Sequence, residues 1–181
     1  MTAALRACGF KNVEFLAKGH FGRIYSIKSD EINKDVVIKI FKSEKEKDTS
    51  MELREINILM GYSHPNVLNG IKIIANEDCP NIESGIILMK ASGDLIDYID
   101  SDDNKLEFLD RNMMANDIVD GIRFLHNVDV LHKDIKPDNI LVVHESKHKI
   151  KCIVSDFGLV NVVGLLRMPW EKLCVSILPG G

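Results

Sequence analysis

The chain has 181 residues, which suits one domain or two small lobes that share a cleft. Its 23 Lys and Arg residues are outnumbered by 27 Asp and Glu residues, and the net charge of −4 argues against nucleic-acid or anionic-membrane binding. Hydrophobic residues make up 45% of the chain, enough for a core, which excludes disorder over the whole length.

The N-terminus and the cysteines predict an intracellular protein, cytoplasmic or nuclear. Residues 1–10 lack the apolar stretch of a secretory signal, and the longest charge-free apolar run, 157–166, is about half of what a helix needs to cross a bilayer. The cysteines show no CxxC spacing, so we expect reduced thiols and neither a disulfide framework nor a zinc site. They are Cys8, Cys79, Cys152 and Cys174.

The first half of the chain predicts a small sheet with one helix. Runs of β-branched and aromatic residues, separated by glycine and polar turns, indicate strands. The expected strands are Phe10–Leu16, Arg23–Ile27, Asp35–Phe41, 67–75 and 84–90, with a polar turn at Ser29–Lys34. The charge run 42–48 predicts a solvated connector.

The expected helix of the first half begins near Thr49, which forms a capping-box pattern with Glu52. Apolar residues then follow at helical spacing, and Gly61 is a stop signal. These apolar residues are Leu53, Ile56, Leu59 and Met60.

The second half predicts a longer helix over 110–126, followed by strands at 140–143 and 151–154 that a polar turn connects. One face of the helix is apolar. The residues on that face are Met114, Ile118, Ile122 and Leu125.

Four motifs carry chemical information. Gly19 and Gly22 lie in a turn between strands, where the backbone could approach a phosphate, although a tight hairpin has the same pattern. Val37 and Lys39 point to one face of a strand, so Lys39 needs either a partner or access to solvent. Glu55, beside the apolar stripe of the first helix, is a candidate partner.

The third motif is the polar cluster 132–139, between a helix and an apolar strand. If its loop is compact, Asp134 could accept a hydroxyl proton, Lys136 could neutralise a phosphoryl group, and Asn139 could bind a hard cation. In the fourth motif, Asp156 follows an apolar strand and precedes Phe157-Gly158, a good position for holding Mg²⁺.

In this order, the four motifs identify a resemblance to the eukaryotic protein kinase family, of the serine/threonine type, over residues 10–158. The resemblance implies an α+β, bilobal protein-kinase-like fold. Residues 1–90 would form an N-lobe with a sheet and one helix, and residues 91–181 a mostly helical, incomplete C-lobe. It also implies phosphoryl transfer from ATP, with Mg²⁺, to a Ser or Thr hydroxyl of a protein substrate.

The resemblance also implies a role for each matching residue. Gly19 and Gly22 would cover the ATP phosphates, Lys39 would hold the α- and β-phosphates, and Glu55 would position Lys39. Three apolar residues would enclose the adenine, and the hinge between the lobes would lie near Leu88–Ala91. The adenine residues are Ile24, Val37 and Leu141.

In the catalytic loop, Asp134 would be the base and Lys136 would contact the γ-phosphate, while Asn139 and Asp156 would bind Mg²⁺. The remaining matches are structural, because buried side chains at these positions align the lobes of a kinase. These matches are Leu59, His132 and Phe157.

The sequence departs from the family pattern at Ala17, the usual first glycine, and at Lys133, where most kinases carry arginine. A larger departure follows Gly158, because residues 159–181 contain three charged residues and no APE motif. A truncated product, an altered splice or reading frame, or a partial record would each explain this tail. We expect residues 159–166 to pack against the second lobe. The alternatives to an active kinase are a nucleotide-binding pseudokinase or regulatory scaffold, and an inactive fragment.

Overall fold

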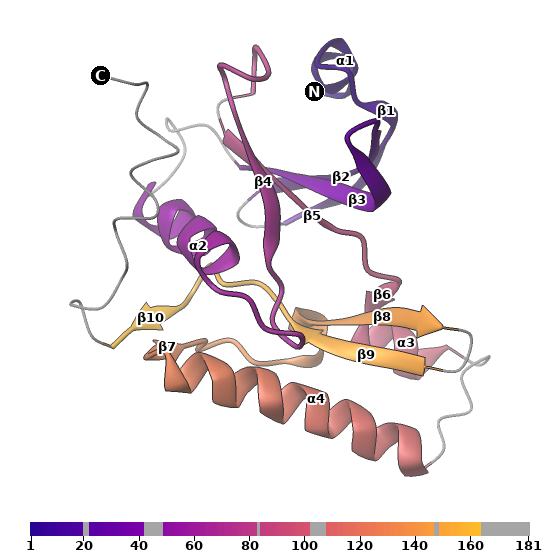
Figure 1. Ribbon diagram of the computed structural model, residues 1–181, viewed down its shortest axis with the longest axis vertical. Helices are drawn as coiled ribbons and strands as arrows, with labels where there is room; N and C mark the ends of the chain where they lie inside the picture. The colour runs from indigo at the N-terminus through magenta and orange to yellow at the C-terminus, as the bar shows by residue number, and fades with distance from the viewer. Residues whose placement is uncertain (20–21, 42–48, 83, 102–107, 147–148, 164–181) are drawn as a thin grey trace.

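The computed structural model describes residues 1–19, 22–41, 49–82, 84–101, 108–146 and 149–163. The charge run 42–48, expected to be a connector, lies outside the described residues, as does the tail from residue 164 onward. Figure 1 shows the larger sheet at one end of the molecule and the long helix α4 (Phe108–Asn127) at the other.

The five-stranded sheet is antiparallel, with strand order β1-β2-β3-β5-β4. All five strands predicted from the sequence are present. They are β1 (Lys11–Lys18), β2 (Gly22–Ser29), β3 (Ile32–Phe41), β4 (Gly70–Ala75) and β5 (Ser84–Met89). The expected turn at Ser29–Lys34 is too long, because Ser29 already pairs with Ile32 and only Asp30 and Glu31 form the turn.

The two faces of this sheet belong to two separate apolar clusters, because side chains alternate along each strand. On β3, Val36, Ile38 and Ile40 are buried in one cluster, together with Leu5 near the N-terminus. We call this the outer cluster. Val37 and Phe41 point the other way and pack in a second cluster, which we call the central cluster.

The helix α2 (Thr49–Gly61) covers the face of the sheet that carries the central cluster. Ile56 and Leu59 are buried there, as the apolar spacing predicts. Leu53 and Met60 are exposed, so the buried stripe is narrower than the sequence suggests.

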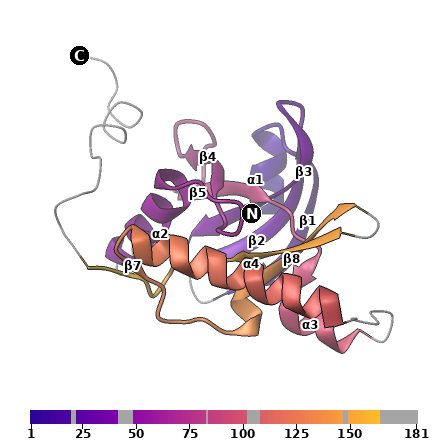
Figure 2. The ribbon, with the colours of Figure 1, turned by 60° about the horizontal axis from the view of Figure 1, so that its bottom comes forward.

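The second lobe is built on α4 (Phe108–Asn127), which lies beneath the hairpin of β8 (Ile140–Ser146) and β9 (Lys149–Val154) (Figure 2). The predicted apolar face of this helix is confirmed: Met114 and Leu125 are buried, and Ile118 and Ile122 pack against them. The short elements α3 (Leu95–Asp100) and β6 (Gly93–Asp94) lie beside β8.

The loop that connects α2 to β4 binds directly to the second lobe. Asn66 is buried, its Nδ2 donates to the Cys152 carbonyl at 3.0 Å, and its own carbonyl accepts from Val154 N at 2.9 Å. Gly121 of α4 faces the Asn66 carbonyl so closely that a Cβ atom there would collide with it. The absence of a side chain at residue 121 therefore allows α4 to pack against this loop.

An aromatic contact strengthens the same connection. The ring of His64 stacks on Phe124 of α4 with centroids 4.6 Å apart, and the Tyr62 ring meets Phe124 edge-on at 6.2 Å. Both Tyr62 and His64 follow the last residue of α2, so the C-terminal end of α2 is fixed to α4.

Two cysteines form a disulfide, so the expectation of reduced thiols is wrong for Cys8 and Cys79. Their Cα atoms are 5.3 Å apart although 71 positions separate them in the sequence. Cys8 follows α1 (Thr2–Ala7), a helix that the sequence analysis missed. Cys152 is a free, buried thiol, and burial raises its pKa to about 12, which makes it unreactive.

The first residues of the tail pack only in part as expected. Val160 is buried and Val162 contacts the central cluster, where β10 (Asn161–Val162) pairs with β7 (Val130–Leu131). Leu159 and Val163 are exposed, and residues 164–166 of the predicted packed segment lie outside the described residues. Among the described helices, none is long and apolar enough to cross a membrane.

Candidate active site

Lys39 and Glu55 form the ion pair that the sequence predicts. Lys39 lies on β3, on the face that carries the central cluster, and its Nζ pairs with Oε1 of Glu55 from α2. The side chains are only 12% and 4% exposed, so water screens this pair weakly. The pair links the sheet to α2 and holds one ammonium group beside the apolar interior.

Phe41 is a neighbour of this ammonium group that the sequence analysis missed. Its ring centroid lies 5.5 Å from Lys39 Nζ, within the range of a cation–π contact. Strand alternation could have identified it, because residues 39 and 41 lie on the same face of β3.

The glycine-rich turn joins β1 to β2. Gly19 N donates to Gly22 O at 2.9 Å, and residues 20 and 21 lie outside the described residues. Gly22 passes close to the Ile40 carbonyl, where a Cβ would collide with it. Ala17, at the usual first glycine, pairs with Ile24 in the β1–β2 ladder.

The three residues expected to enclose an adenine come from both lobes. Ile24 on β2 pairs with Lys39, and Val37 on β3 is partly buried against the central cluster. Leu141 on β8 also packs against that cluster. Between the lobes, Lys90 N donates to Asp35 O and Ser92 N donates to Val142 O, which places the connection at Lys90–Ser92, at the end of the expected hinge.

The loop after β7 brings Asp134, Lys136 and Asn139 together, as the compact-loop hypothesis requires. Asp134 Oδ2 lies 3.0 Å from Lys136 Nζ and accepts from Asn139 Nδ2 at 2.8 Å. The same Nδ2 also donates to the Asp134 carbonyl, so Asn139 closes the loop. A short 3-10 helix, Pro137–Asn139, makes the turn that allows this closure.

These contacts set the charges of the loop. The hydrogen bond from Lys136, followed by that from Asn139, lowers the pKa of Asp134 below its usual value. The bond to Asp134 in turn raises the pKa of Lys136. Asp134 is therefore an ionised carboxylate at neutral pH, and its partner is a full cation.

His132 connects the loop 132–139 to the segment that follows β9. Its Nε2 lies 2.8 Å from the Ser155 carbonyl, and its Nδ1 accepts from Asp134 N at 3.3 Å. Burial lowers its pKa, so the ring is neutral, and the two contacts require the tautomer with the proton on Nε2. The ring also meets Phe157 edge-on, with centroids 5.4 Å apart.

Asn139 precedes β8 and Asp156 follows β9, so the antiparallel pairing of these strands brings both residues to the same end of the hairpin. Ile140 pairs with Val154, and just beyond this pair Ser155 N donates to the Asn139 carbonyl at 2.9 Å. Because Asn139 donates both bonds to Asp134 from Nδ2, its side-chain oxygen can serve as a ligand. This amide oxygen and the carboxylate of Asp156 are the kind of ligand that Mg²⁺ prefers, so the chemistry of the two residues fits this ion.

Two residues of the site have left-handed backbone conformations that side chains rarely adopt. Asp156 has φ 61° and Lys133, the residue in the usual arginine position, has φ 67°. Lys133 is exposed. Strain of this kind persists where the surrounding contacts over-determine the backbone, and it concentrates at functional sites.

Comparison with known proteins gives consistent matches. The protein kinase domain family matches residues 10–174, so the match extends beyond residue 158, where the resemblance of the motifs ends. Myosin light chain kinase 2 of skeletal and cardiac muscle from Bos taurus is 32% identical over 90% of this chain and 25% of its own length. Human myosin light chain kinase 3 is 31% identical over 90% of this chain and 19% of its length.

A more distant organism gives a similar match. A protein named "probable serine/threonine-protein kinase" from Dictyostelium discoideum is 32% identical over 83% of this chain and 21% of its own length. The chain thus spans about a quarter or less of the length of these curated relatives.

Proposed function

Because the chain belongs to the protein kinase family, we propose that it transfers the γ-phosphoryl group of ATP to a Ser or Thr hydroxyl of a protein. The observation that carries this proposal is the contact set of Asp134, Lys136 and Asn139. It joins a carboxylate, a cation and an amide within one short loop. The relatives are named as serine/threonine or myosin light chain kinases, which supports the choice of a hydroxyl acceptor.

In the proposed reaction, the hydroxyl oxygen of the substrate forms a bond to the γ-phosphorus as the bond from that phosphorus to the leaving oxygen of ADP breaks. The hydroxyl proton passes to a carboxylate oxygen of Asp134. The chain contributes mainly by positioning the reactants and neutralising their charge.

The basicity of Asp134 would depend on whether Lys136 contacts Asp134 or the γ-phosphate. In this structure, Lys136 lowers the pKa of Asp134 and makes it a weak base. A γ-phosphate that attracts the Lys136 ammonium would remove this stabilisation of the carboxylate. Asp134 would then bind a proton more readily, when the substrate is in place.

The nucleotide would lie between the lobes. Lys39, held by Glu55, would bind the α- and β-phosphates, with Gly19 and Gly22 above them. Ile24, Val37 and Leu141 would enclose the adenine. Asn139 and Asp156 would hold Mg²⁺, which neutralises phosphate charge when bound.

Nucleotide binding and phosphoryl transfer should be tested separately on this chain. We expect ATP with Mg²⁺ to raise the melting temperature, and we expect transfer of labelled phosphate to a Ser/Thr peptide. Lys39→Met should lower transfer by about 100-fold or more while the protein remains folded. Lys28→Met, which removes an exposed lysine of β2, is the control.

Asp156→Asn should weaken the part of nucleotide binding that depends on Mg²⁺, and an unchanged dependence would remove Asp156 from the metal site. No binding at millimolar ATP in a folded sample would refute the assignment of the nucleotide site. Binding without any transfer would favour the regulatory scaffold, and the absence of cooperative unfolding would favour an inactive fragment.

The substrate and the setting are parts of the same proposal. ATP is an intracellular substrate, so we place the chain in the cytoplasm or nucleus, with a protein partner that carries the acceptor hydroxyl. The net charge of −4 gives no support for a nucleic-acid or membrane partner.

A further inference from the structure

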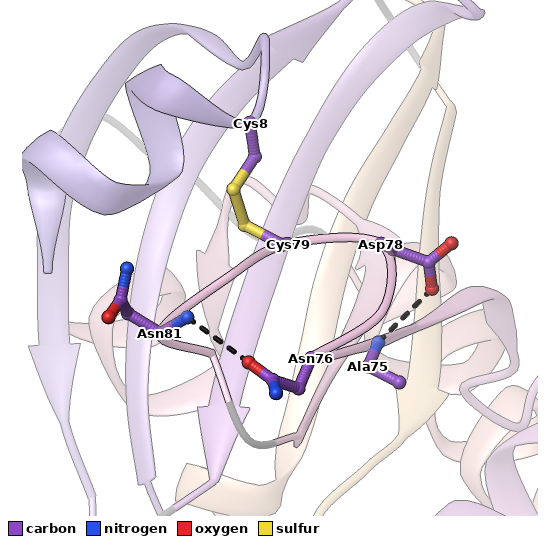
Figure 3. The surroundings of a disulfide bond; sticks show 6 residues. All are labelled: Cys8, Ala75, Asn76, Asp78, Cys79 and Asn81. Atoms are coloured by element: carbon purple, nitrogen blue, oxygen red, sulfur yellow. Dashed lines mark hydrogen bonds between the residues drawn. A yellow bond between two sulfur atoms is a disulfide. The ribbon is translucent and has the colours of Figure 1, made fainter.

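The disulfide between Cys8 and Cys79 connects two segments that cover the outer cluster. Cys8 ends α1, whose Leu5 is fully buried, and Cys79 lies in the loop between β4 and β5 (Figure 3). Leu5 and Cys79 both belong to the outer cluster, with Ile82 of the same loop. The outer cluster thus has a cover with two halves, the helix α1 and the loop between β4 and β5, and the disulfide joins these two halves.

The loop half of this cover has its own hydrogen bonds. Ala75 N donates to a carboxylate oxygen of Asp78 at 3.2 Å, and Asn81 N donates to Asn76 Oδ1 at 3.2 Å. The Ala75 carbonyl accepts from the backbone N–H groups of both Asp78 and Cys79 at 3.0 Å. This loop does not need the disulfide to keep its shape.

The helix half depends more strongly on the bond. Helix α1 has six residues, too few to be stable alone, and Leu5 is its one buried residue. A glycine turn ends it: Gly9 has φ 89°, and Phe10 N donates to the Leu5 carbonyl at 3.2 Å. Leu5 packs α1 against the outer cluster, and the disulfide adds a covalent attachment to the loop between β4 and β5.

We propose that the Cys8–Cys79 bond is a reversible thiol–disulfide site that fastens α1 over the outer cluster when oxidised and releases it when reduced. The co-reactant is a small thiol of the glutathione class. The exchange itself needs no kinase activity, but its reversibility rests on the intracellular setting of the proposed function. In that setting a disulfide is usually transient or redox-sensing, which agrees with a reversible bond.

The burial of the two sulfurs decides where exchange begins. Cys79 is 1% exposed and Cys8 is partly exposed, so an incoming thiolate reaches the Cys8 sulfur. A bond forms between the reagent and Cys8, and the electron pair of the broken bond goes to Cys79, which takes a proton. A second thiol attacks the reagent's sulfur in this mixed disulfide and frees Cys8. The protein gains two thiols, and two reagent thiols become one disulfide.

Hydrogen exchange and mass spectrometry of the whole chain, in reduced and oxidised glutathione, test the proposal. In the oxidised sample we expect one cross-linked peptide that contains Cys8 and Cys79. On reduction, amides of residues 2–10 should exchange about tenfold faster or more, while those of 75–82 stay protected. The melting temperature should fall by about 10 °C.

Cys8→Ala should show the rapid exchange and the lower melting temperature in both buffers. Cys152→Ala, which removes a buried thiol outside the bond, should keep the redox response. Free Cys8 and Cys79 in a folded oxidised sample would overturn the proposal. So would equal exchange of residues 2–10 in both buffers, or a bond that survives reduced glutathione.

Discussion

The ammonium group of Lys39 is held by two different kinds of contact, a carboxylate and an aromatic face. Glu55 supplies a charge, and Phe41 supplies the negative face of its ring at 5.5 Å. In its proposed role this cation binds phosphates, so it must be held firmly yet remain able to bind its ligand. The ring contributes to this because it attracts the ammonium without occupying its hydrogen-bond donors.

Phe41→Leu should therefore weaken ATP binding by about fivefold, because a cation–π contact of this kind contributes about 1 kcal/mol. Titration calorimetry or a nucleotide thermal shift would measure this change. Ile40→Val removes a methyl group on the opposite face of β3 and should lower stability without changing ATP affinity. Equal ATP affinities for Phe41→Leu and Ile40→Val would show that the ring does not position Lys39.

His132 should make the protein less stable in mild acid. Its pKa is lowered in the folded protein from the usual 6.5, mainly by burial, so below pH 6.5 the unfolded chain binds the extra proton more readily. The contribution of the neutral ring to stability is complete above pH 6.5 and is lost as the pH falls toward the folded-state pKa.

Urea unfolding at pH 7.5 and 5.5 would measure this effect. His132→Gln can still donate to the Ser155 carbonyl but cannot titrate, so it should reduce the loss of free energy of unfolding between these pH values. His144→Gln, at an exposed site on β8, should leave the loss unchanged. A wild-type pH dependence in the His132→Gln variant would assign the acid sensitivity to other groups.

At the scale of elements, the packing of α4 against the α2–β4 loop should tolerate no side chain at residue 121. Gly121→Ala would place a Cβ against the Asn66 carbonyl and beside Val154, and both are buried. We expect a loss of about 1–3 kcal/mol in the free energy of unfolding, as overpacking usually costs. Gly61→Ala, at the end of α2 with open space around it, is the control and should be neutral or slightly stabilising.

An unchanged stability of Gly121→Ala in urea unfolding would mean that the loop moves away at little cost. The hydrogen bonds of Asn66 to Cys152 and Val154 would then have to break or lengthen.

The sequence predicted the elements whose pattern is local. The strands of the sheet, α2 and α4 have clear periodicity, and the contacts of Asp134 with Lys136 and Asn139 lie within a few positions of one loop. The ion pair of Lys39 and Glu55 was also predicted, from the inward-facing lysine together with the helix position that the kinase resemblance assigns to Glu55. The functional roles of these residues stay predictions.

The missed features depend on contacts between distant segments. Helix α1 has six residues and one buried side chain, too little for a periodic signal. The bond between Cys8 and Cys79 spans 71 positions and has no motif, so only the fold brings the two together. Likewise, nothing in the local sequence shows that Asn66 binds the second lobe.

For the molecule as a whole, the central cluster should make the two lobes unfold together. It contains Leu59 of α2, Leu125 of α4 and the fully buried Phe157. The outer cluster, in contrast, has members from the sheet lobe alone among the described residues.

Phe157→Ala should cost about 3–5 kcal/mol and accelerate hydrogen exchange in both α2 and α4. Ile27→Ala, in the outer cluster, should accelerate exchange mainly in β2 and its neighbours. If Phe157→Ala leaves the exchange of α4 unchanged, the lobes are independent units and the central cluster does not couple them.

Because the C-terminal end of α2 is fixed, a tilt of this helix about that end would displace the residues nearer its N-terminus. Tyr62 and His64 hold that end against Phe124 of α4. Glu55 lies six residues before Gly61, about 9 Å from it along the helix axis. A tilt of α2 by about 10° about that end would move the Glu55 carboxylate by about 1.6 Å, enough to break its bond to Lys39. The orientation of α2 would thus control the ion pair without any change in the residues that form it.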